Sequence, residues 1–209
     1  MKRRKKIMTT IFIVIALTVI TWIALTIVVQ QMGPEKLATV GKNDDYNALV
    51  IYDPDPIYNL DEKVSIAFAE GLSESRWKSK IATVAAAKKI EESFDLYVFC
   101  ANTYNWAPDK AIRNYIKNST DLEGQRVVAI TLGSGSTKRS QRMLEALITQ
   151  KKATLIDSKT FWLMKPNDES KTKRSNRKIA LEMANNFGKE IADRIRNEKN
   201  EVLSKDSGF

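Results

Sequence analysis

The stretch "VFCANTYNWAPDKAIRNYI", residues 98–116, contains the transition on which the fold prediction depends. The run Phe94–Ala101 is apolar enough, and short enough, for a buried β-strand, and a polar segment follows it. Over Pro108–Asn118 the apolar side chains return at helical spacing, with Ala111 and Tyr115 on one side. The stretch therefore predicts a strand, a loop and a helix in immediate succession.

The same alternation extends along the chain in both directions. The other predicted strands are Tyr46–Tyr52, Ile81–Val84, Arg126–Leu132 and Ala153–Asp157, and the other predicted helices are Asp61–Ser75, Lys138–Gln150 and Asn176–Asn197. Strands that alternate with helices indicate a parallel sheet covered on both faces, in a doubly wound α/β domain. Ligands of such sheets bind at the carboxyl ends of the strands. The loops after Tyr52, Cys100 and Leu132 are therefore the places to look for a site.

The second of these loops carries a family resemblance. Asn102-Thr103-Tyr104, Trp106 and Pro108 resemble the segment that follows the third strand of flavodoxin-family proteins, although Ala107 stands where that family usually has Gly. The stretch "EGQRVVAITLGSGS", residues 123–136, is similar to the family's fourth strand and the loop that borders the flavin. The resemblance implies a flavodoxin-like three-layer sandwich with a five-stranded parallel sheet in the order 2-1-3-4-5.

The resemblance also implies a cofactor, FMN, bound without covalent attachment and used for electron transfer. The cofactor-binding residues that it suggests come from three loops: Tyr58 and Asn59, Asn102, Thr103, Tyr104 and Trp106, and Gly133, Ser134, Gly135 and Ser136. Tyr104 and Trp106 would stack on the flavin ring, and the Gly133–Ser136 loop would approach it from the other side. The alternative is that the two aromatic residues pack under the sheet edge and that the Gly-Ser loop is a plain turn.

The loop after the first predicted strand departs from the family. In "YDPDPIYNLDEK", residues 52–63, Pro54 and Pro56 remove amide donors, and Asp53 and Asp55 add negative charge where a phosphate would lie. If FMN binds, we expect amides near Tyr58 and Asn59 to hold the phosphate, the two aspartates to turn away, and the affinity to be poor. Asn59 and Glu62 also form a capping-box-like pair at the start of the following helix.

The same acidic loop leaves two other functions open. "LVIYDPDP" fits the strand and Asp-x-Asp pattern of haloacid-dehalogenase-like phosphohydrolases, in which Asp53 would be the nucleophile and Asp55 the acid, with magnesium between them. Pro56 and the lack of a late acidic pair count against this reading. The remaining alternative is a flavin-free flavodoxin-fold interaction module.

The amino-terminal segment predicts a membrane anchor. Residues 7–29 contain no charged side chain and exceed the roughly 20 apolar residues that span a bilayer. Cations at positions 2–6 precede this span, so the positive-inside rule places residues 1–6 in the cytoplasm and the rest of the chain outside it. The expected organisation is a cytoplasmic basic tip (1–6), a single transmembrane helix acting as signal anchor (7–29), a linker (30–45), a flavodoxin-like domain (46–198) and a flexible tail (199–209).

Composition excludes several other functions. The net charge is +9, but five of the 34 basic residues are at positions 2–6, and the remaining 29 exceed the 25 acidic residues by only 4, which gives little support for nucleic-acid binding. The chain has no His and only Cys100, which excludes an intrachain disulfide, His-based acid–base catalysis and Cys/His zinc sites. No metal is expected, and the predicted partners are the membrane and a redox partner protein.

Overall fold

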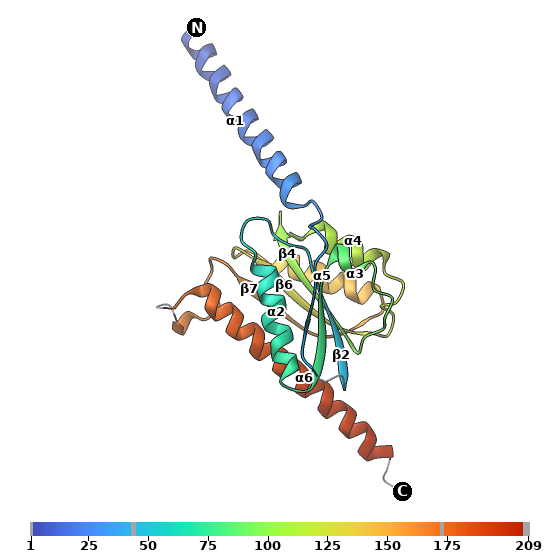
Figure 1. The fold of residues 1–209 in the computed structure, drawn as a ribbon. Coiled ribbons are helices and arrows are strands. Elements are labelled where there is room, and N and C mark those ends of the chain that lie inside the picture. Colours follow the sequence, from blue (N-terminus) through green and yellow to red (C-terminus); the bar gives the residue numbers. More distant parts are fainter. Residues whose placement is uncertain (1, 43–44, 172–173, 207–209) are drawn as a thin grey trace. The chain divides into compact units, whose positions relative to one another are not determined.

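A computed structural model describes residues 2–42, 45–171 and 174–206 of the chain (Figure 1). The chain divides into two compact units, Met1–Gln31 and Met32–Phe209. The first unit is essentially one helix, α1, and the second contains the whole sheet. Each unit is described by itself.

The first unit is the helix α1 (Lys2–Val29), which is long and apolar enough to cross a membrane. The most apolar stretch of this helix is not buried in a protein core. Three threonine hydroxyls, those of Thr9, Thr10 and Thr18, donate to backbone carbonyls four residues earlier, at 2.8 to 3.0 Å. Such bonds satisfy a hydroxyl within its own helix, which suits it to a lipid environment.

The second unit is built on one sheet in the order β1-β3-β2-β4-β6-β7. Its strands are β1 (Leu37–Val40), β2 (Tyr46–Tyr52), β3 (Trp77–Thr83), β4 (Leu96–Tyr104), β6 (Arg126–Gly133) and β7 (Thr154–Trp162), with β5 (Ala107–Pro108) paired to β4. The run β3-β2-β4-β6-β7 is parallel throughout, so the predicted order 2-1-3-4-5 is confirmed. The predicted number of strands is wrong, because β1 and β5 add antiparallel pairings on β3 and β4.

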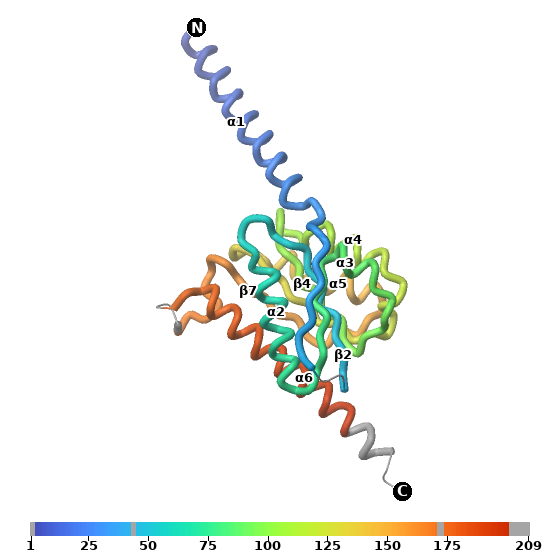
Figure 2. The backbone as a smooth tube through the Cα atoms, viewed as in Figure 1, coloured from blue at the N-terminus to red at the C-terminus, as the bar shows by residue number. Residues whose placement is uncertain are grey.

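Helices cover both faces of the sheet (Figures 1 and 2). One hydrophobic cluster joins the sheet to α2 (Leu60–Ser73) and α6 (Asn176–Asp206). A second cluster joins the opposite face to α3 (Val84–Ala87), α4 (Lys110–Asn118) and α5 (Lys138–Gln150). A short 3-10 turn, Glu169–Lys171, precedes α6. The three-layer α/β arrangement predicted from the sequence is therefore the one observed.

The packing of α2 against α6 brings two backbones very close together. A Cβ added at Gly71 would lie 2.0 Å from the carbonyl oxygen of Asn185, and one at Gly188 would lie 2.2 Å from that of Phe68. Phe68 and Phe187 meet edge to face beside these glycines, with ring centroids 5.5 Å apart. Because Phe187 is buried, the predicted packing of the last helix onto the domain through this ring is confirmed.

The segment expected to be a linker is in part a structural element of the domain. Residues 37–40 form β1, and Lys36 exchanges backbone and side-chain hydrogen bonds with Thr83 at the end of β3. The Gly33 amide donates to the Asp53 carboxylate at 2.9 Å. At the other end, α6 continues to Asp206, past residue 199 at which a flexible tail was predicted. Residues 207–209 of that tail lie outside the described residues.

Candidate functional site

A cleft of about 130 Å³ lies at the carboxyl ends of β2, β4 and β6. Its lining residues are Asp55, Tyr58, Leu60, Asn102, Thr103, Tyr104, Gly133, Ser134 and Leu163. Six of the ten residues proposed from the sequence as cofactor contacts are in this set: Tyr58, Asn102, Thr103, Tyr104, Gly133 and Ser134. The cleft lies where the strand order reverses between β2 and β4, which is where open α/β sheets bind ligands.

The other four proposed residues lie around the cleft and do not line it. Asn59 precedes α2 in a left-handed conformation and makes no side-chain cap, so the predicted cap is wrong, although its side chain does hydrogen-bond to Glu62 as the predicted pair requires. Gly135 packs against the side chain of Lys165. Ser136 and Trp106 are exposed.

Trp106 lies at the tip of the hairpin that joins β4 to β5 (Ala107–Pro108). The two turn residues, Asn105 and Trp106, have φ values of 51° and 60°, the left-handed pair of a type I′ turn. A bulky aromatic residue rarely adopts this conformation, and such backbone strain concentrates at functional sites. The indole is 55% exposed, so the turn holds a large apolar surface in solvent beside the cleft.

Gly133 and Ser134 also line the cleft, at the end of β6, the strand next to β4. A Cβ at position 133 would come within 2.7 Å of the Thr137 side chain and 3.2 Å of that of Thr103, so only glycine fits there. The Gly133 carbonyl accepts from the Leu163 amide at 2.9 Å. The Ser134 carbonyl accepts from the amides of Met164 and Lys165, at 3.1 and 2.9 Å. The loop is therefore a hydrogen-bonded wall, and not a plain flexible turn.

The acidic loop after β2 is folded around its own carboxylates. The amides of Ile57 and Tyr58 donate to Oδ1 of Asp55 at 2.7 and 2.8 Å, and the hydroxyl of Tyr104 donates to Oδ2 at 2.7 Å. Asp55 therefore faces these amides, and the expectation that it turns away from a bound phosphate stays a prediction. The attraction between an aspartate and the amides two and three residues ahead, as in an Asx-turn, accounts for this arrangement.

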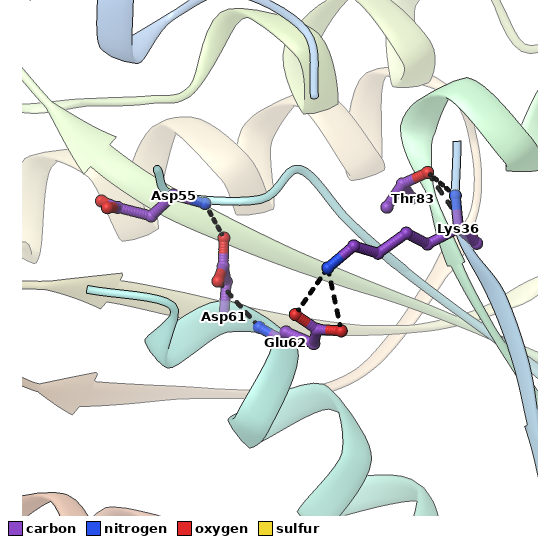
Figure 3. A network of polar contacts seen from close by, with 5 residues as sticks. All are labelled: Lys36, Asp55, Asp61, Glu62 and Thr83. Carbon is purple, nitrogen blue, oxygen red and sulfur yellow. Dashed lines mark hydrogen bonds and ion pairs between the residues drawn. The ribbon is translucent and has the colours of Figure 1, made fainter. Parts of the chain in front are cut away.

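A second carboxylate, Asp61 in the first turn of α2, fixes the same loop from beneath (Figure 3). It accepts from the amides of Asp55 and Glu62 at 2.6 and 2.8 Å, and from the side-chain amide of Asn102 at 2.8 Å. Asn102, proposed as a flavin contact, thus links β4 to the loop after β2. Figure 3 also shows Glu62, which holds Lys36 at 3.1 Å.

Two further buried acids complete the cluster. Asp53 accepts from Gly33 through Oδ1, and its carbonyl accepts from the side chain of Asn102 at 3.2 Å. Asp109 caps α4 by accepting from the Ile112 amide at 2.8 Å, and it accepts from the Asn102 amide at 3.0 Å. Sequence reasoning missed Asp61 and Asp109 as parts of the site. Asp109 lies at the start of the helix predicted over Pro108–Asn118, and the N-cap preference of Asp was a usable signal for it.

Burial sets the proton affinity of these acids. It raises the pKa of Asp53 to about 6, with the Gly33 amide opposing the shift and Asp61 adding to it. Burial also raises the pKa of Asp109 to about 8, against the two amides that it accepts from, and it raises the pKa of Asp61. The pKa of Tyr104 is raised by burial and by its bond to Asp55, so the phenol remains a donor at neutral pH. Perturbed acids gathered at a cleft mark a candidate functional site.

The residues present fit only one half of an FMN molecule. Tyr104 offers an aromatic side chain to the cleft, and Gly133 and Ser134 offer backbone that a ring can approach closely. The phosphate half does not fit, because Pro54 and Pro56 have no amide and the loop amides of Asp55, Ile57 and Tyr58 already serve carboxylates. The cleft volume is also below the roughly 300 Å³ at which pockets for drug-sized ligands begin.

The hydrolase alternative lacks an open acid pair in this geometry. The Asp53 carboxylate is buried and bonded to Gly33, and both oxygens of Asp55 are engaged. Within residues 2–42, 45–171 and 174–206, no group of three His, Cys, Asp or Glu side chains could hold a metal ion. A magnesium-dependent mechanism through Asp53 and Asp55 therefore has no support in the arrangement of these residues.

Comparison with known proteins gives a fold and no sequence family. No protein-family model matches the chain, and no curated protein matches its sequence. Among solved structures, a flavodoxin, WrbA-like protein from Agrobacterium tumefaciens aligns with a TM-score of 0.54 and 16% identity, over 73% of this chain and 99% of that one. A flavodiiron protein from Giardia intestinalis aligns with a TM-score of 0.57 and 19% identity, over 74% of this chain and only 37% of that one.

A flavodoxin from the domain Archaea aligns with a TM-score of 0.50 and 9% identity, over 72% of this chain and 99% of that one. At such identities the likeness establishes the fold and leaves the ligand open. The parallel run β3-β2-β4-β6-β7, covered by helices on both faces and matched by these structures, identifies the chain as a protein of flavodoxin-like fold.

Proposed function

We propose that the protein is a single-pass membrane protein whose flavodoxin-like domain binds a flavin ring and acts in electron transfer. The observation that carries the proposal is the cleft at the β2/β4 switch point, which is lined by Tyr104, Gly133 and Ser134. The structural neighbours are flavodoxins and a flavodiiron protein, which favours the same ligand class. FMN is the family's usual form of that ligand, and its ring is the part that this cleft supports.

A bound flavin would supply the redox chemistry, and the protein would position and shield it. Tyr104 would offer its ring, and its hydroxyl would stay fixed by Asp55. Trp106, exposed on a strained turn beside the cleft, would close over the ring. Gly133 permits the close backbone approach on the other side.

The membrane anchor belongs to the same proposal. The helix α1 has the length and composition of a span, and its basic residues precede the apolar run. The positive-inside rule then places the flavodoxin-like domain outside the cytoplasm, where it would exchange electrons with a redox partner protein. Protease added to intact cells should degrade the domain, and protection until the membrane is broken would contradict this orientation.

Flavin titration tests the ligand. The full-length protein in detergent should quench the fluorescence of added riboflavin or FMN, because aromatic stacking in a closed cleft quenches flavins. Trp106→Ala should weaken the quenching, whereas Trp22→Ala, in the apolar helix α1, should leave it unchanged. Absence of quenching with both flavins would contradict the proposed function.

One observation favours a second function, a flavin-free interaction module. The loop after β2 is internally satisfied, and large apolar side chains on the rim of the cleft are exposed, at Ile57, Trp106 and Met164. Such a surface suits contact with another protein. If the protein binds neither riboflavin nor FMN, and Trp106→Ala abolishes its binding to a partner protein, the interaction module is the better function.

A further inference from the structure

We propose that Asp55 is a built-in replacement for the phosphate of the ligand, so that the cleft selects a flavin without phosphate, of the riboflavin class, over FMN. This inference rests on the proposed function, since it specifies which flavin the same cleft takes. The hydrogen bonding of the loop after β2 supports it, because a phosphate-binding loop would present free amides at this place.

The backbone donors of this loop are already committed. Positions 54 and 56 are prolines and have no amide hydrogen. The amide of Asp55 donates to Asp61 at 2.6 Å. Those of Ile57 and Tyr58 converge on Oδ1 of Asp55, at 2.7 and 2.8 Å. Two adjacent amides that converge on one anionic oxygen form the kind of nest that elsewhere binds a phosphate oxygen.

The replacement carboxylate is fixed at both oxygens. Oδ1 of Asp55 takes the two amides, and Oδ2 takes the Tyr104 hydroxyl at 2.7 Å. An incoming phosphate would have to displace a group that is covalently attached and therefore always at high effective concentration. It would also break charge-assisted hydrogen bonds, which are the stronger kind.

The surrounding charges disfavour a second anion. Asp53, Asp61 and Asp109 lie buried behind the loop, joined through Asn102. Arg177 reaches the loop, where it donates to the Tyr58 carbonyl at 2.9 Å. A phosphate dianion added here would meet the Asp55 carboxylate at short range, whereas a neutral ribityl chain carries no charge to be repelled.

Competitive titration of the full-length protein in detergent tests this selectivity. Riboflavin should bind about tenfold or more tightly than FMN, a factor that corresponds to about 1.4 kcal/mol. Equal or tighter binding of FMN would overturn the inference and leave the proposed function standing. Binding of neither flavin would overturn the proposed function and the inference with it.

Variants at position 55 test the cause. Asp55→Ala removes the internal anion and should shift the FMN-to-riboflavin affinity ratio towards FMN by about tenfold, through two freed amides and one lost charge. Asp55→Asn keeps the size of the side chain and should give a smaller shift in the same direction, which covers the case that the alanine variant fails to fold. An unchanged ratio in a folded variant would overturn the role assigned to Asp55.

Asp95→Ala is the matched control. Asp95 also accepts from a backbone amide, that of Asn47 at 2.8 Å, but it precedes β4 (Leu96–Tyr104) at the opposite end of the sheet. Its loss removes the same charge and the same type of hydrogen bond far from the cleft. The affinity ratio should stay at the wild-type value, and a shift as large as that of Asp55→Ala would mean that net charge alone sets the preference.

Discussion

The helix α2 belongs to two regions of opposite character. Its body packs against α6 through Phe68 and Gly71, where apolar surfaces meet so closely that backbones touch. Its first turn supplies Asp61 to a network of buried carboxylates and amides at the carboxyl end of the sheet. The apolar face stabilises the fold by burying surface, whereas the polar end keeps acids in an environment that raises their pKa and so reduces stability at neutral pH. Unfavourable groups kept at a cleft indicate function, and a tight apolar face indicates structure.

The largest effect on stability is expected from a substitution in the apolar contact between α2 and α6. Phe187→Ala should lower the free energy of unfolding by about 3–5 kcal/mol, since a buried ring leaves a cavity beside Phe68. Urea unfolding followed by circular dichroism would measure it. Lys178→Ala, on the exposed side of the same helix, is the control and should change stability little.

Adding one methyl group tests the close approach on the same face. Gly188→Ala should cost about 1–3 kcal/mol, because the new Cβ would lie 2.2 Å from the Phe68 carbonyl oxygen and the helices must separate. Alanine is the better helix former, so a gain in stability would show that the two backbones are not in contact. Asn186→Ala, at an exposed position nearby, gives the effect of helix propensity alone.

A neutral side chain at position 53 tests whether the buried acids at the polar end reduce the stability of the fold. Because the folded pKa of Asp53, about 6, lies above its ordinary value of 3.8, the folded state binds the proton more tightly. The carboxyl's contribution to stability is full below pH 4 and is lost as the pH rises through 6.

Asp53→Asn should therefore raise the free energy of unfolding at pH 7 by roughly 1 kcal/mol and flatten its pH dependence between about 4 and 6. Denaturant unfolding at several pH values measures both. The control is Asp45→Asn, which removes a surface acid that pairs with Arg76. A variant at position 53 that is less stable at pH 7 would show that the Gly33 hydrogen bond requires the charged acceptor.

The smallest expected effect concerns the strained turn. Trp106→Gly should raise the free energy of unfolding by about 0.5 kcal/mol. A left-handed φ costs a bulky residue about 1–2 kcal/mol, which glycine avoids, but glycine loses more conformational entropy on folding and this offsets part of the gain. The same variant should lose flavin quenching. Higher stability with lost flavin binding would mean that this turn, like the polar end of α2, reduces stability and serves function. Unchanged flavin binding would show that Trp106 is not part of the site.

Periodicity in the sequence predicted the fold well because the central strands are short, continuous apolar runs. The order of the five parallel strands followed from that pattern together with the flavodoxin resemblance. β1 (Leu37–Val40) was missed because it is a four-residue edge strand with mostly exposed side chains, so it has no burial pattern to detect. The start of β3 was placed late because Ser79, a polar residue, points inward.

The candidate site was less predictable, since it depends on contacts between residues far apart in the chain. The cleft position followed from the fold, and residues 102–104 and 133–134 were found from the family resemblance. The network of Asp53, Asp61 and Asp109 requires the tertiary structure, because Asn102 joins them across three loops. The contact from Asp55 to the amides two and three residues ahead is local, and the Asx-turn tendency of Asp was a usable signal for it.

The carboxylate clamp of Asp55 also bears on how such a protein is made. A binding loop with free amides gains stability only when its ligand arrives, so its folding depends on the supply of that ligand. Here the loop carries its acceptor within the polypeptide, and its amides are paired as soon as the chain folds. In the proposed orientation the domain would cross the membrane as an unfolded chain, and this loop would then fold there without a supply of phosphate ligand.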